Sequence, residues 1–311
     1  MSSNFRWRRV PPIPFLLYLL LRYVLMVVDM FPYAMAPKVG RFLGRIVHFI
    51  DRRHVRVAST NLAKVSGVCP ADEIPEFVER IYDHLGLSLV EMLMTPRLLE
   101  RGQVSDHVTV ENTGIVDAIL KEGRGAIIAI GHLGNWEITG IAVALHGYRL
   151  NSLARPIENP WIDRYLNRFR THTGHSIISK YHALGAMVAT LQRNELLVIQ
   201  IDQDARHQGV FVDFFGRPAS THRSPAVLSL KYGTPIVPVN IFREGNRHRC
   251  VVTEAFYPDP YRGLPDPTQA LTQAFTRRFE EFVRQHPEQW FWVHRRWKTE
   301  RPEEKRTEAL A

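Results

Sequence analysis

Hydrophobic and polar positions divide this chain into two parts. As far as about residue 100 the apolar residues mostly recur at helical spacing, and beyond it short apolar runs alternate with amphipathic stretches. The later pattern predicts strands at 126–130, 149–154, 176–179, 196–201, 235–242 and 249–254. The whole pattern predicts helices at 71–100, 112–121, 136–145, 160–173, 184–192, 224–232 and 267–285. Such alternation indicates an α/β fold with a mixed, mainly parallel sheet flanked by helices.

The segment 15–36 is the longest apolar stretch, and Arg22 and Asp29 are its only charged residues. A spanning helix needs about 20 apolar residues, and Arg22 interrupts this run near its middle. A group of basic residues before position 10 precedes it, and no small-residue cleavage pattern follows, which argues against a signal peptide. The pattern favours an N-terminal membrane anchor over residues 1–36, either spanning or lying at the interface. A buried apolar hairpin is the alternative.

The segment 39–56 predicts an amphipathic helix with separate apolar and basic stripes. Residues 1–66 hold eleven Lys and Arg but two acidic residues, so the whole net charge of +9 lies there. Beside an anchor, this excess favours an anionic membrane surface, and no interleaving of aromatic and basic residues suggests nucleic acid. A helix packed on the core is the alternative. The apolar stripe comprises Val39, Phe42, Leu43, Ile46 and Ile50, and the basic one Arg41, Arg45, His48 and Arg52.

Length and composition are those of an ordinary globular protein, with 311 residues, 45% hydrophobic and 23% charged. No linker divides residues 37–311, which we expect to form a single domain behind a helical membrane-associating layer. Cys69 and Cys250 form no disulfide or zinc motif. Asp202 and Asp204 could bind a metal, but no further ligand spacing supports one, so we expect neither a metal nor a cofactor.

The clearest chemical signal is GAIIAIGHLGNWE at 125–137, where a buried strand ends in a turn and a helix begins. His132 follows the strand, and Glu137 lies five residues on, which suits a general base and the carboxylate that orients it. Asn135 lies in the turn, where substrate and a developing oxyanion could meet backbone N–H groups. Since the chain has no G-x-S-x-G elbow and no plausible nucleophilic cysteine, the base would activate an acceptor hydroxyl directly, without an acyl-enzyme.

Further polar residues follow later predicted strands. Arg155 ends one strand, and Arg168 and Arg170 lie on the helix after it, so we expect these arginines to bind phosphate groups. Asp202 ends the strand 196–201 and is expected to join a polar network that holds the arginines.

Two aromatic groups have open interpretations. Phe214 and Phe215, in FVDFFG at 211–216, are expected either to form a hydrophobic wall for an acyl chain or to belong to a core strand and turn. The segment 290–298 combines tryptophans with basic residues, and it could lie at the membrane interface or cap the core.

Together these segments resemble the late acyltransferases of lipid A biosynthesis, of the lauroyl and myristoyl type, within the wider group of HX4E glycerolipid acyltransferases. The likeness covers nearly the whole chain. It rests on GHLGNWE at 131–137, ARPIENP at 154–160, IDQDARHQGVFVDFFG at 201–216, SPAVLSLKYGTPIVPV at 224–239 and FWVHRRWK at 291–298.

The resemblance implies a glycerolipid acyltransferase-like domain at the cytoplasmic face of the inner membrane. It implies acyl transfer from acyl carrier protein or acyl-CoA to a hydroxyl of a membrane glycolipid, such as a lipid A precursor. His132 matches the family's base and Glu137 its partner carboxylate, while Asp202 and one arginine at 168 or 170 match further polar positions. The acceptor stays open, since the family also acylates phosphatidylinositol mannosides. A lysophospholipid acceptor and an inactive membrane scaffold are further alternatives.

Overall fold

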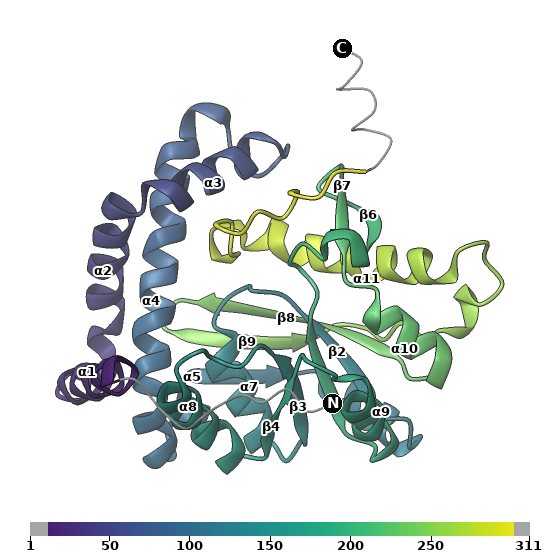
Figure 1. Cartoon of the computed structure of the whole chain (residues 1–311), viewed down its shortest axis with the longest axis horizontal. Coiled ribbons are helices and arrows are strands. Elements are labelled where there is room, and N and C mark those ends of the chain that lie inside the picture. The colour runs from purple at the N-terminus through teal and green to yellow at the C-terminus, as the bar shows by residue number, and fades with distance from the viewer. Residues whose placement is uncertain (1–11, 302–311) are drawn as a thin grey trace.

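The computed structural model describes residues 12–301, apart from the side chains at positions 169 and 172. A seven-stranded sheet forms the centre of the molecule, in the order β1-β9-β8-β2-β5-β3-β4 (Figure 1). Every neighbouring pair in it is parallel except β8 and β9. The predicted mixed, mainly parallel sheet is therefore confirmed. Its strands are β1 (Val108–Glu111), β2 (Ala126–Ile130), β3 (Leu150–Ala154), β4 (His175–Ser179), β5 (Leu196–Gln200), β8 (Ile236–Glu244) and β9 (Arg247–Val252).

Helices cover both faces of this sheet because its strands are apolar on both sides. Along β2, Ile127 and Ala129 pack with α9, α10 and α11, whereas Ile128 and Ile130 face the side of α6 and α7. The hairpin β6 (Val210–Phe214) and β7 (Arg217–Thr221) lies against α11. The helices of this part are α5 (Val104–His107), α6 (Gly114–Lys121), α7 (Trp136–Leu145), α8 (Pro160–His172), α9 (Leu184–Gln192), α10 (Ser224–Tyr232) and α11 (Pro267–Gln285).

The N-terminal part forms a helical layer beside the sheet (Figure 1). It consists of α1 (Pro12–Asp29), α2 (Ala36–Ile50), α3 (Arg52–Ala63) and the long α4 (Ile74–Glu100). The predicted helix over 39–56 is wrong in one respect, since it breaks at Asp51. The carboxylate of Asp51 accepts a hydrogen bond from the backbone N–H of His54, so it caps a new helix instead of continuing the old one.

The apolar stripe predicted on 39–56 faces away from the protein. The buried residues of α2 are the small ones, Ala36, Gly40 and Gly44, whereas Phe42 and Ile50 are 64% and 71% exposed. The alternative of a helix packed on the core is confirmed in part: α2 packs on α4, but it does so through these small residues, and apart from Val39 the apolar stripe is left exposed. An outward apolar stripe on a basic helix suits a membrane interface.

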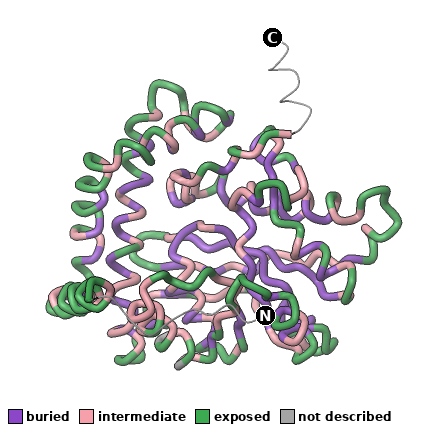
Figure 2. The backbone as a smooth tube through the Cα atoms, in the orientation of Figure 1, coloured by how far each residue is buried: buried purple, intermediate pink, exposed green. Residues whose placement is uncertain are grey.

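The first helix is exposed along almost its whole length (Figure 2). Leu25 is its one buried residue, so the alternative of a buried apolar hairpin is wrong. Among the described residues, α1 is the single helix long and apolar enough to cross a membrane, judged by length and composition alone. The basic residues before position 10 lie outside the described part of the chain, and the domain boundary at residue 36 stays a prediction.

Candidate active site

The site is centred on a histidine and an aspartate that follow two adjacent strands. Ile130 on β2 pairs with Gln200 on β5, so His132 and Asp202 both stand two residues beyond the paired positions. Nδ1 of His132 lies 2.8 Å from Oδ1 of Asp202. The backbone N–H of His132 also donates to Oδ2 of the same carboxylate, at 2.7 Å. Parallel register thus unites two residues that are 70 positions apart in the sequence.

Asp202 is held as a buried carboxylate. It is 4% exposed, and the indole N–H of Trp290 donates to its Oδ2 at 2.8 Å. Burial alone would raise the pKa of Asp202, but the charge of His132 and the three hydrogen bonds lower it further than burial raises it. Asp202 is therefore a fixed negative charge directly behind the imidazole ring.

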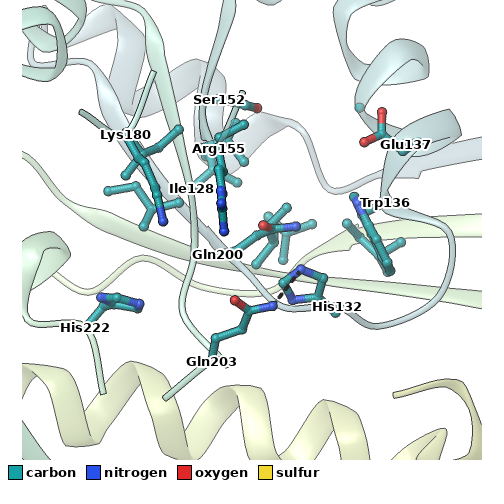
Figure 3. Close-up of a pocket in the computed structure, with 18 of the residues that line it drawn as sticks. Ile128, His132, Trp136, Glu137, Ser152, Arg155, Lys180, Gln200, Gln203 and His222 are labelled. Atoms are coloured by element: carbon teal, nitrogen blue, oxygen red, sulfur yellow. Dashed lines mark hydrogen bonds between the residues drawn. The ribbon is translucent and has the colours of Figure 1, made fainter. Parts of the chain in front are cut away.

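The opposite edge of the His132 ring faces a cavity (Figure 3). Burial lowers the pKa of His132, but Asp202, with a smaller contribution from Glu137, outweighs burial and leaves this pKa above its ordinary value. Nε2 of His132 lies 3.4 Å from the side-chain nitrogen of Gln203, and the Trp136 ring packs edge-on at 4.9 Å between centroids. With Nδ1–H donating to Asp202, Nε2 is free to accept a proton.

The structure corrects the expected partner of His132. Glu137 makes a two-point ion pair with Arg170 of α8, at 2.5 and 3.1 Å, and Arg170 also donates to Asn167 at 3.1 Å. The carboxylate on the imidazole is that of Asp202. Glu137 lies in the first turn of α7, from which its side chain extends towards α8, whereas a residue at the end of the neighbouring strand reaches the ring directly.

Asn135 is also placed differently from the expectation. It is 3% exposed and is not among the residues that line the cavity. Its side-chain oxygen caps α7 by accepting from Ile138 N–H, and its amide donates to Oε2 of Glu91 at 3.2 Å. The N–H of Gly134, expected to face an oxyanion, donates instead to the carbonyl of Gln289. Asn135 therefore shapes the turn rather than contacting substrate.

Glu91 of α4 is the centre of a buried polar network behind this turn. It is 1% exposed and forms ion pairs with Arg243 and His248, both from the β8–β9 hairpin. The hydroxyl of Tyr33, between α1 and α2, donates to it at 3.2 Å. Burial raises the pKa of Glu91, but the hydrogen bond and charge of His248 and those of Arg243 lower it to about 2. The N-terminal layer is thus connected to the turn after β2 through one ionised carboxylate.

The cavity in front of His132 has a volume of about 1120 Å³. Its outer part is polar and includes Gln203, Lys180 and His222 (Figure 3). Its inner part continues between the sheet and the helices α6 and α7, where many of the lining residues are apolar and a smaller number, such as Ser152, Gln200 and Glu137, are polar. Residues of this inner part include Val116, Ile128, Ile130, Val143, Val198 and Val239.

The predicted arginines lie at different places. Arg170 lines the cavity but is paired with Glu137, and Arg155 lines it, exposed and paired with Glu158 at 3.0 Å. Arg168 is exposed and is not part of the lining. Asp202 contacts His132 and Trp290, so the expectation that it holds the arginines is wrong.

Phe214 and Phe215 belong to the core. They are 0% and 3% exposed, and both pack against Trp290. Neither lines the cavity, so the expected acyl-chain wall is wrong and the alternative, a core strand with its turn, is confirmed. The acyl-sized apolar space lies on the other face of the sheet.

Sequence reasoning missed several residues of the site. Glu91 interrupts an apolar stretch of α4 between Val90 and Met92, and this interruption is a signal of a buried, paired charge. Gln203, in contrast, was expected with Asp202 and Asp204 at the end of the strand 196–201, and it lies at the cavity beside His132. His175, whose Nε2 lies 2.7 Å from the hydroxyl of Ser152 on the cavity wall, carries no local signal, because the contact depends on the pairing of β3 with β4.

The chain is similar to known bacterial lipid acyltransferases. The family described as bacterial lipid A biosynthesis acyltransferase matches residues 3–299. A phosphatidylinositol mannoside acyltransferase of Mycolicibacterium smegmatis is 24% identical, over 79% of this chain and 80% of that protein. A lipid A biosynthesis palmitoleoyltransferase of Escherichia coli K12 is 23% identical, over 86% of each chain.

Among solved structures, the 1-acyl-sn-glycerophosphate acyltransferase PlsC of Thermotoga maritima aligns with a TM-score of 0.40 and 13% identity, over 83% of this chain and 99% of that one. A similarity this distant adds nothing to the functional argument. The family match, in contrast, spans α1, the turn that holds His132 and the C-terminal aromatic segment. The chain is an acyltransferase and belongs to the bacterial lipid A biosynthesis acyltransferase family.

Proposed function

We propose that this protein transfers a fatty acyl chain from a thioester donor, acyl carrier protein or acyl-CoA, to a hydroxyl of a membrane glycolipid. The observation that carries the proposal is the position of the His132–Asp202 pair. It stands where a polar cavity mouth meets an apolar interior. A base at such a boundary can reach a carbonyl whose acyl chain lies in the apolar part while the acceptor hydroxyl approaches through the polar part.

The inner cavity suits an acyl chain in both chemistry and position. Its walls come from β2, β5 and β8 on one side and from α6 and α7 on the other. Burying an acyl chain there stabilises the complex by about 0.8 kcal/mol for each methylene group removed from water. This binding energy leaves the thioester carbonyl, at the end of the chain, near the polar mouth.

The reaction then needs a single proton relay. Nε2 of His132 takes the proton of the acceptor hydroxyl while the hydroxyl oxygen attacks the thioester carbonyl. Asp202 keeps the proton on Nδ1 and stabilises the imidazolium that forms. As the tetrahedral intermediate collapses, the new carbon–oxygen bond remains, the carbon–sulfur bond breaks, and the imidazolium returns its proton to the leaving thiolate. Both substrates are bound together, and no acyl-enzyme forms.

We propose a glycolipid acceptor because the matched relatives named for lipid A and for phosphatidylinositol mannosides both act on glycolipids. A lipid A precursor is the acceptor that the family description favours. The active site would then open at the cytoplasmic face of the inner membrane, with α1 and α2 in contact with the bilayer. The intact His132–Asp202 pair argues against an inactive scaffold.

The test compares purified protein with lipid A precursors, phosphatidylinositol mannosides and lysophosphatidic acid as acceptors, each with acyl-carrier-protein and CoA thioesters. We expect one glycolipid class to gain the mass of one acyl chain. His132→Ala should lower kcat by on the order of a hundredfold or more, because general-base catalysis typically supplies this much. Mass spectrometry of lipids from cells with and without the protein should show the same acyl mass on the same class.

Two results would contradict the proposal. One is transfer to lysophosphatidic acid alone. The other is an acylated enzyme that accumulates without acceptor at a rate fast enough to explain turnover.

A further inference from the structure

A second, smaller cavity lies between α3 and the segment 295–298, at the C-terminal end of the described chain. Its volume is about 300 Å³, and five of the nine residues around it are basic, while none is acidic. The basic residues come from α3 and from the C-terminal segment. We call this cavity the basic groove. Its cations are Arg53, Arg56, Lys64, Arg295 and Lys298.

The two sides of the basic groove are fixed to each other by a buried contact. Asn61 of α3 is 5% exposed, and its amide donates to the carbonyls of Trp292 and His294, both at 2.7 Å. These contacts join positions more than 200 residues apart in the sequence. The convergence of the cations is therefore a property of the fold and not of two flexible surface segments.

Within the described range, 12–301, the cations of the basic groove are not matched by carboxylates. None of the five forms an ion pair with a carboxylate among the described residues. Like charges gathered in one groove repel one another, and an anion bound among them removes this repulsion. Arginines in such a position bind phosphate groups at two points, and lysine adds a further point charge.

The basic groove is continuous with the reaction cavity. Arg53, Val57, Arg295 and Lys298 line both spaces. The chain also connects them, because Phe291 N–H donates to the carbonyl of His132 at 3.0 Å and the groove residues follow a few positions later. The order along this path is apolar cavity, catalytic histidine, basic groove.

From this order we infer that the basic groove binds the phosphate of a phosphopantetheine thioester donor, an inference that rests on the proposed function. Such a donor joins an acyl chain to a phosphate through a long uncharged arm, with the reactive carbonyl at the acyl end. With the chain in the apolar cavity and the carbonyl at His132, the arm extends outward and its phosphate meets the cations. CoA and acyl carrier protein share this chemistry.

The test reverses the two charges that line the basic groove alone, in the double variant Arg56→Glu/Lys64→Glu. The measured quantity is the ratio of kcat/KM for a CoA thioester to that for the phosphate-free N-acetylcysteamine thioester of the same acid. We expect this ratio to fall about tenfold or more, because the phosphate loses charge-assisted hydrogen bonds and meets two carboxylates in their place. Lys121→Glu/Arg217→Glu, a matched reversal of exposed cations outside both cavities, should leave the ratio unchanged.

The ratio is also measured with an acyl-carrier-protein thioester in place of the CoA thioester. The two ratios together show whether the groove binds the phosphate that both donors share or a feature of one donor. A fall with both donors supports the shared phosphate. A fall with acyl carrier protein alone would mean that the groove meets the carrier's surface, and this would overturn the assignment. The assignment would also be overturned if the double variant kept the wild-type ratio but bound anionic vesicles more weakly. The cations would then bind lipid headgroups and not the donor phosphate.

Calorimetry with CoA and with pantetheine gives a readout that does not depend on turnover. Tighter binding of CoA, lost in Arg56→Glu/Lys64→Glu, would support the basic groove even if no acyl transfer occurred and the proposed function failed. Equal binding of CoA and pantetheine by the wild-type protein would overturn the inference while leaving acyl transfer intact.

Discussion

At the scale of single residues, the proposed catalytic pair differs from the one that sequence proximity suggests. Glu137 is five positions from His132, yet it is the partner of Arg170, and Asp202 holds the imidazole. Glu137 still acts on His132 through its charge, because it contributes to raising the pKa of the imidazole. The site therefore contains two carboxylates with different partners, one on the imidazole of His132 and one on an arginine of the cavity wall.

Asp202→Asn should move the acid limb of the pH–rate profile. The base must be neutral to accept a proton, so activity falls as pH drops through the pKa of His132. In the wild type the negative charge of Asp202 raises the pKa of His132, and burial of the ring lowers it. The variant lacks this charge but keeps the burial, so the pKa of His132 falls and the acid limb should shift to lower pH. At its plateau kcat should fall by on the order of a hundredfold, because the tautomer and the imidazolium lose support. An unshifted limb in a steady-state pH series would show that Asp202 does not set the pKa of the base.

The neighbouring arginines of α8 should differ sharply. Arg170→Ala removes both hydrogen bonds to Glu137 and leaves that carboxylate unpaired in the cavity wall, so kcat/KM should fall about tenfold or more. Arg168→Ala, an exposed change on the same helix, is the matched control and should stay near wild type. In a double-mutant cycle, Glu137→Gln and Arg170→Ala should be clearly non-additive. Additive effects on kcat/KM would mean that the two residues contribute independently and not through their ion pair.

At the scale of elements, α2 and α4 pack through glycines rather than large side chains. A Cβ on Gly44 would lie 2.1 Å from the carbonyl oxygen of Tyr82, and one on Gly86 would lie 2.2 Å from the carbonyl oxygen of Gly40. Neither contact can be relieved by a side-chain rotation, because both involve backbone atoms. This close approach leaves the large apolar residues of α2 outside the interface, where they form its exposed stripe.

Gly44→Ala should therefore destabilise the protein although alanine favours helices. The two helices must separate to admit the methyl group, and we expect the free energy of unfolding to fall by about 1–3 kcal/mol in urea titrations. Gly185→Ala in α9 is the control, because a Cβ there meets no atom within 4 Å. It should be neutral or slightly stabilising. If the two variants had the same free energy of unfolding, α2 would be able to move away from α4 without loss of stability.

The elements themselves were largely predictable from the sequence, and the contacts between them were not. β2 is a short apolar run bounded by glycines and β5 is one bounded by polar residues near its ends, so the predicted limits agree with the structure to within a residue. The break at Asp51 was missed because the helical pattern continues on both sides of it. His132 could be found from its own neighbours, whereas its pairing with Asp202 depends on which strands are adjacent and in which register. No residue pattern near His132 or Asp202 in a single sequence predicts how β2 pairs with β5.

At the scale of the whole molecule, one side carries most of the exposed apolar surface. α1 and α2 hold most of the large exposed hydrophobic residues, including Phe42, Phe49 and Ile50. An apolar surface of this extent, within the basic N-terminal fifth of the chain, is typical of a protein that lies on or in a membrane. The interior stays in contact with this surface through Tyr33 and Glu91.

Removal of residues 1–36 should reduce sedimentation with anionic vesicles, and high salt should weaken what binding remains. In the full-length chain, Phe49→Asp/Ile50→Asp should also reduce binding without loss of stability, because both side chains are about 70% exposed. Leu184→Asp, at an exposed apolar residue of α9, is the control and should bind as the wild type does. Equal sedimentation of all these proteins would contradict a membrane-binding N-terminal layer.

The shared register of β2 and β5 has a consequence for folding. Neither His132 nor Asp202 has a partner until these two strands pair, so the reactive geometry forms in the same event as the centre of the sheet. A slip of one residue would turn every side chain of the slipped strand to the other face and separate the pair. A chain trapped in such a state would keep its helices and show a near-native circular dichroism spectrum, yet it would be inactive. Recovery of activity on refolding therefore reports correct strand pairing more strictly than recovery of secondary structure does.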